Sequence, residues 1–114
     1  MELYVNNQYH HQAAVKYAAP QGDALLVDIQ ATRARYSLLV AHALHMSGGT
    51  AMAYSTWWAR LLSQVGLHVD LRVTLILADT NSEATAAGGR HGARRTDWQR
   101  VCQEHGLKDL AQMR

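Results

Sequence analysis

Apolar and polar residues alternate over the N-terminal part of the chain, which is the pattern of β-strands. Residues 3–5 (LYV) and 9–18 (YHHQAAVKYA) flank residues 6–8 (NNQ), and asparagine tolerates the positive φ of a tight turn. The pattern therefore predicts an N-terminal hairpin. Residues 20–22 (PQG) predict a turn after it, and the apolar run ALLVDI at 24–29 predicts the next strand.

Residues 31–46 (ATRARYSLLVAHALHM) fit two patterns. Tyr36, Leu39, Val40, Ala43 and Leu44 would share one face of a helix that ends at residues 48–49 (GG). The same stretch also alternates, from Tyr36 to Leu44, as a further meander strand would. We favour the helix.

The middle of the chain has two clearer elements. Ser55 is placed as an N-cap, and Gly66 as the residue that follows a helix. The residues between them that share an apolar face are Trp58, Leu61, Leu62 and Val65. In residues 67–79 every second residue is apolar, which predicts a long strand with one face on helices and the other in water.

The C-terminal third begins with residues 80–95, which are small, polar and glycine-rich and predict a flexible loop. Residues 96–99 (TDWQ) match a capping box, so a helix is expected from there to the break at Gly106, followed by a short helix at 107–113. The predicted fold class is α+β in a single domain over 1–114. Its antiparallel sheet combines the N-terminal hairpin with strand 67–79, and two or three helices pack on one face.

Composition narrows the class of protein. The chain has 114 residues, 48% hydrophobic and 18% charged, which is typical of a globular domain. One cysteine excludes an internal disulfide, and we see neither a secretory signal nor a membrane-spanning apolar run. These features predict a cytoplasmic protein with no membrane partner.

Positive charge is concentrated near the C-terminus. Residues 1–89 hold five Lys/Arg against six Asp/Glu, whereas residues 90–114 hold six against three. Arg90, Arg94 and Arg95 lie in the predicted loop just before the predicted helix, whose N-terminus attracts anions, and Arg100 follows in that helix. Neither nucleotide-binding glycine motif is present. The alternatives are a loop that grips an anion or an acidic partner, and a solvated connection.

Histidine and cysteine supply the candidates for metal and thiol chemistry. His42 with His45, and Cys102 with His105, form two i, i+3 pairs that together would supply four zinc ligands. Cys102 could also pair with a histidine as a nucleophile, although a lone cysteine on an apolar helix face is commonly a small buried residue. Asp79 is the acid placed at the end of a strand, where sites of α/β proteins gather.

The preferred hypothesis for function is a non-enzymatic binding or regulatory protein without a cofactor. It would engage an acidic protein surface or a nucleic-acid backbone through Arg90, Arg94, Arg95 and Arg100, with Trp57 as an edge tryptophan that contributes to binding and a homodimer as a possibility. In size and architecture the chain is similar to small phage and plasmid accessory proteins, some of which inhibit host enzymes. The alternative is a small zinc-dependent or thiol enzyme.

Overall fold

The computed structural model describes residues 3–4, 6, 8, 12–43, 51–71, 74–80 and 89–110, with the backbone alone at 51 and 89–94. The chain divides into two compact units. The first comprises Met1–His42 and Arg60–Asp79, and the second comprises Ala43–Ala59 and Thr80–Arg114. Each unit is described by itself below.

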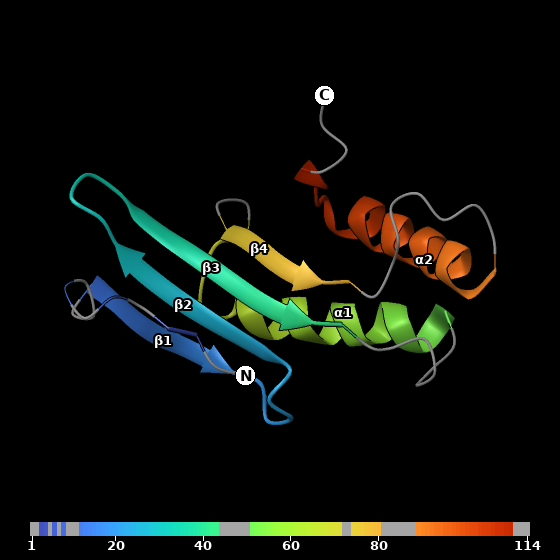
Figure 1. Cartoon of the computed structure of the whole chain (residues 1–114), viewed down its shortest axis with the longest axis horizontal. Helices are drawn as coiled ribbons and strands as arrows, with labels where there is room; N and C mark the ends of the chain where they lie inside the picture. The colour runs from blue at the N-terminus through green and yellow to red at the C-terminus, as the bar shows by residue number, and fades with distance from the viewer. Residues whose placement is uncertain are drawn as a thin grey trace. The chain divides into compact units, whose positions relative to one another are not determined.

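The first unit contains a four-stranded sheet in the order β1-β2-β3-β4 (Figure 1). Its strands are β1 (Ala13–Ala18), β2 (Ala24–Gln30), β3 (Arg35–His42) and β4 (Thr74–Asp79). β1 pairs with β2, and β2 with β3, in antiparallel fashion, whereas β3 and β4 are parallel. A parallel pair needs a crossover, and the chain between β3 and β4 is long enough to include a helix.

Tight turns connect the antiparallel strands. Gly22, at φ 75°, donates its backbone N–H to the Ala19 carbonyl at 2.9 Å, which closes the turn between β1 and β2. The Ala31 N–H donates to the Ala34 carbonyl at 2.7 Å between β2 and β3. These turns fix the strand register and, with it, which side chains share a face of the sheet.

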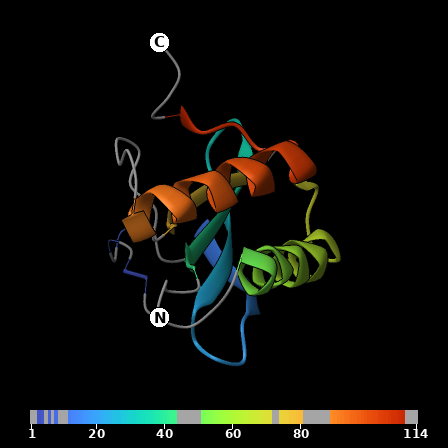
Figure 2. The same cartoon turned by 90° about the vertical axis from the view of Figure 1, so that its right-hand side faces the viewer.

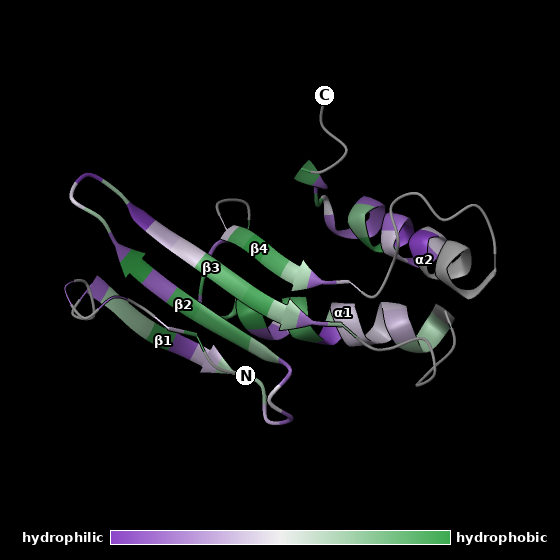
Figure 3. Ribbon diagram, viewed as in Figure 1, coloured by the Kyte–Doolittle hydropathy of each residue, from purple (hydrophilic) through white to green (hydrophobic). Residues whose placement is uncertain are grey.

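One face of the sheet is more deeply buried than the other. Leu26, Leu39 and Ile76 are aligned in register on that face, and Leu26 and Leu39 are fully buried. The opposite face carries Val40 beside Leu77, which is exposed. Apolar residues accordingly run along β2, β3 and β4 (Figure 3).

Helix α1 (Ala51–Gly66) contributes to both units. Its C-terminal half places Leu61, Leu62 and Val65 in the core of the first unit, so the apolar face predicted for this helix is confirmed. Its N-terminal half belongs to the second unit with helix α2 (Gly89–His105). These two segments run in the same direction in both views (Figures 1 and 2).

The α+β class is confirmed, but the antiparallel sheet is corrected to a mixed one, and the described residues hold two helices. Residues 35–42 form a strand, so the helix favoured at 31–46 is wrong there; residues 44–46 lie outside the described residues. The local pattern of residues 35–42 suits both a helix and a strand. Hydrogen bonding to β2 on one side and to β4 on the other selects the strand, because it pairs the backbone N–H and C=O groups of these residues.

The predicted strand boundaries also change. The described residues 3, 4 and 6 lie in no strand, and β1 pairs with β2 instead of forming the N-terminal hairpin. Strand 67–79 shortens to Thr74–Asp79, with residues 72–73 outside the described residues. The chain turns after α1 because the N–H groups of His68 and Val69 both donate to the carbonyl of Val65.

Candidate functional site

A histidine and an aspartate stand side by side where β3 and β4 end. His42 is the last residue of β3, Asp79 is the last of β4, and the two are register partners in the parallel pair. Both strands point the same way, so their carboxyl ends lie at one edge of the sheet (Figure 1). His42 Nε2 lies 3.5 Å from Asp79 Oδ2, and the two side chains are 59% and 64% exposed.

The backbone around this pair is anchored on both strands. The His42 N–H donates to the Asp23 carbonyl at 2.8 Å, which ties the end of β3 to the start of β2. Within the second unit, the hydroxyl of the fully buried Tyr54 donates to the carbonyl of Thr80 at 2.7 Å. Thr80 directly follows Asp79 in the chain. Strand pairing holds the backbone of both residues in register, and the hydrogen bond to Asp23 adds a further restraint at His42.

This arrangement suits proton transfer. A carboxylate that accepts a hydrogen bond from one imidazole nitrogen favours one tautomer and orientation of the ring, which leaves the other nitrogen to accept a proton. With Nε2 facing Asp79, that nitrogen is Nδ1 of His42. Water and small molecules can reach the pair because both side chains are more than half exposed. The pair is therefore a candidate general acid–base site.

Sequence reasoning named both residues but did not connect them. Asp79 was singled out by its place at the end of a strand, and His42 was a zinc candidate with His45, which lies outside the described residues. The missing link is the register of β3 against β4. Reading residues 35–42 as a strand would have placed His42, like Asp79, directly after an apolar run, which is the signal for a shared sheet edge.

The arginine candidates lie on a helix and not on a loop. Because α2 begins at Gly89, the loop predicted at 80–95 is wrong from residue 89 onward, and Thr96 does not cap the helix. Trp98 and Val101 are buried and anchor α2. Once a helix has nucleated, each added residue contributes one hydrogen bond, so α2 can extend back from this anchor to Gly89. Residues 81–88 lie outside the described residues.

The arginine side chains do not share one environment. Arg100 is exposed, whereas Arg95 is half-buried and its Nε is buried without a hydrogen-bond partner among the described residues. The side chains of Arg90 and Arg94 lie outside the described residues. The described part of the cluster is therefore not an exposed group of guanidinium ions.

Trp57 is half-buried in the second unit. Its ring meets Trp58 edge-to-face, with ring centres 5.0 Å apart and planes at 88°. Trp58 is fully buried and contacts Trp98 of α2 at 5.1 Å. The three tryptophans thus form one aromatic cluster, and Trp57 lies at its edge.

The predicted zinc set is not assembled among the described residues, which contain no group of three His, Cys, Asp or Glu side chains able to hold a metal ion. His105 is exposed at the end of α2. The pKa of the Cys102 thiol is raised from 9.0 to about 11, mainly by burial and also by the negative charge of Asp109, while a backbone hydrogen bond lowers it in part. At neutral pH Cys102 is therefore a thiol and a poor nucleophile.

The raised pKa of Cys102 makes stability depend on alkaline pH. The ordinary value of 9.0 applies to the unfolded chain and about 11 to the folded one, so the unfolded state loses its proton first. We expect the stabilisation to be complete below pH 9.0 and to disappear as the pH rises through about 11. Urea unfolding of wild type and Cys102→Ala across this pH range tests the expectation. All other titrating groups are common to the two proteins, so the difference between their pH curves isolates the contribution of Cys102. Parallel pH curves for the two proteins would contradict the shift.

No family model matches the chain, and no curated protein matches it. Among solved structures, the chain is similar to the "Endonuclease domain of TRAS1, a telomere-specific non-LTR retrotransposon", at 12% identity and a TM-score of 0.49. The match covers 82% of this chain and 43% of that one, so this chain spans less than half the length of the endonuclease domain. A likeness of this size assigns no activity to the chain.

The comparison corrects the functional hypothesis. The hypothesis of a non-enzymatic binding protein or a phage- or plasmid-type inhibitor is withdrawn, and the similar solved structure reported above is described as an endonuclease domain. The arginine-rich loop that was to make the contact is helical from residue 89. The alternative of a thiol enzyme is not supported by Cys102, whose raised pKa keeps the thiol protonated at neutral pH, and the described residues hold no group of three side chains able to bind zinc. No helix in the described ranges has the length and apolar character needed to cross a membrane.

Proposed function

We propose that this chain carries the acid–base site of a hydrolase, in which His42 is the general base and Asp79 orients it. The observation that carries the proposal is the 3.5 Å approach of His42 Nε2 to Asp79 Oδ2 at the carboxyl ends of two parallel strands. In ligand-free structures catalytic contacts are commonly longer than in the reacting complex, so this distance suits a working pair.

Hydrolysis is the reaction that the surroundings of the pair support best. An imidazole that is 59% exposed is accessible to water, which can serve as the nucleophile. Nδ1 would take a proton from that water as it attacks the substrate, and the imidazolium that forms would be stabilised by the Asp79 carboxylate. The same imidazolium can then return the proton to the leaving group. His42 thus acts first as a base and then as an acid, Asp79 stabilises its charged form, and the proton is conserved over the cycle.

The test is turnover of a substrate panel by purified protein, with and without magnesium ions so that a metal requirement does not hide activity. The panel holds p-nitrophenyl acetate, p-nitrophenyl phosphate, bis-p-nitrophenyl phosphate and a fluorescent oligonucleotide. The oligonucleotide is included because the similar solved structure is an endonuclease domain. We expect multiple turnover of at least one ester class.

The matched negative is the double variant His42→Gln/Asp79→Asn, purified in parallel to exclude contaminating hydrolases. Both positions are exposed, so the variant should fold as the wild type does, which circular dichroism checks. Turnover by the wild type that the double variant lacks supports the proposal. Equal activity in both preparations, or none with any substrate, refutes it.

A further inference from the structure

A hollow in the second unit is created by the way α2 ends. Gly106 has φ 67°, and the N–H of Leu107 donates to the Cys102 carbonyl at 2.8 Å. This is the six-to-one hydrogen bond of a Schellman motif, in which the residue after the glycine packs against the helix one turn back. The chain therefore reverses and brings Leu107 beside Cys102.

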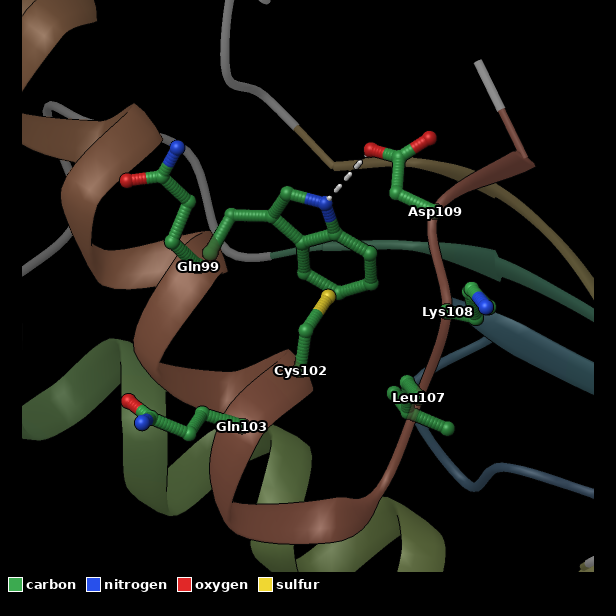
Figure 4. A pocket seen from close by; sticks show the side chains of 7 residues that line it. Gln99, Cys102, Gln103, Leu107, Lys108 and Asp109 are labelled. Carbon is green, nitrogen blue, oxygen red and sulfur yellow. Dashed lines mark hydrogen bonds between the residues drawn. The ribbon is translucent and has the colours of Figure 1, made fainter. Parts of the chain in front are cut away.

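A second contact holds the returning segment in place. The indole Nε1 of Trp98 donates to Asp109 Oδ2 at 3.1 Å, one helical turn before Cys102 (Figure 4). On the returning chain, Asp109 thus lies opposite Trp98, and Leu107 lies opposite Cys102. Between the two walls lies a hollow of about 370 Å³, which is within the size range of small-molecule sites.

The lining combines an apolar floor with amide groups at one side. Trp98, Cys102 and Leu107 supply apolar and aromatic surface. Gln99 and Gln103 are exposed, lie one turn apart on α2, and stand on the opposite side of Cys102 from Leu107 and Lys108 (Figure 4). Figure 4 draws both amide groups pointing away from Cys102, and because these side chains are exposed they can turn toward a ligand in the hollow. Each glutamine amide carries both a donor and an acceptor, so the pair can then bind a ring edge that presents both.

The charges around the hollow favour a neutral occupant. Lys108 and Asp109 contribute one charge of each sign to the lining. Burial and the Asp109 carboxylate both oppose a negative charge at Cys102, as the raised pKa of its thiol indicates, and both would oppose an anionic ligand beside it. The Lys108 ammonium would in turn repel a cation.

We propose that this hollow is a binding site for a neutral, flat heteroaromatic ring with adjacent hydrogen-bond donor and acceptor atoms. The ring lies on Trp98, Cys102 and Leu107, and its polar edge meets Gln99 and Gln103. An adenine ring has this chemistry, since a glutamine amide can bind its amine and neighbouring ring nitrogen together. The site does not depend on the reaction proposed for His42 and Asp79.

Adenosine is the probe, titrated into ¹⁵N-labelled protein and followed by NMR at the Trp98 indole N–H and the Cys102 amide. We expect saturable shifts at both signals. Gln99→Leu and Gln103→Leu remove the amide groups and should together weaken binding at least about tenfold. Gln64→Leu, at an exposed position of α1, is the matched control and should bind as the wild type does.

Two further ligands test the chemistry of the site. Toluene offers a ring with no polar edge, and adenosine monophosphate adds negative charge; both should bind more weakly than adenosine. The proposal fails if adenosine gives no saturable shift up to about 10 mM, or if the glutamine variants bind it as well as wild type. Tighter binding of either comparison ligand refutes it too.

Discussion

Single replacement of His42 by glutamine, or of Asp79 by asparagine, should lower kcat by about 10²–10⁴ on whichever ester the protein hydrolyses. Glutamine at 42 cannot accept the proton of the attacking water. Asparagine at 79 keeps the shape of the side chain but removes the charge that stabilises the imidazolium, and its amide group can favour the wrong imidazole tautomer. KM should change little, because neither residue is assigned to substrate binding.

The double variant distinguishes a working pair from two separate contributions. If His42 and Asp79 act as a unit, the double variant should be no slower than the slower single variant, since either change alone disables the unit. Steady-state kinetics of the three variants measure this. His68→Gln is the matched control, because His68 is another exposed histidine of the first unit and stacks on Tyr17 at 5.6 Å. Losses that multiply, or a comparable loss at His68, would contradict the assigned roles.

The sequence predicted structure well where the local pattern of a segment fits only one kind of secondary structure. The apolar residues from Trp58 to Val65 fit a helix and no strand, and the run at 24–29 between turn residues fits a short strand. Gly106 was expected to end a helix and does so with a positive φ. In each case the deciding interactions lie within a few residues in the chain.

Long-range pairing decided what the sequence left open. Residues 35–42 have apolar residues at both helical and strand spacing, and only hydrogen bonds to β2 and β4 select the strand. The candidate site has the same origin, because His42 and Asp79 are far apart in sequence and meet only through that register. The start of α2 at Gly89 was missed because a capping box seven residues later gave a stronger local signal.

The buried aromatic cluster carries the largest expected change in stability. Trp58→Ala should lower the free energy of unfolding by about 3–5 kcal/mol, because it removes a fully buried indole and the contacts with Trp57 and Trp98. Trp57→Ala is the matched control. Trp57 is half-buried, so Trp57→Ala removes less buried area and the edge-to-face contact with Trp58. That contact contributes about 0.5–1.5 kcal/mol to the free energy of unfolding beyond the buried area.

A third variant separates packing from hydrogen bonding at the same position. The Trp58 Nε1 is buried without a hydrogen-bond partner among the described residues, so phenylalanine at 58 removes an unsatisfied donor as well as part of the ring. Trp58→Phe should therefore cost clearly less than Trp58→Ala. Urea unfolding followed by far-ultraviolet circular dichroism measures all three, since tryptophan fluorescence would change with the mutations themselves. Equal losses for Trp57→Ala and Trp58→Ala would show that the cluster is not centred on Trp58.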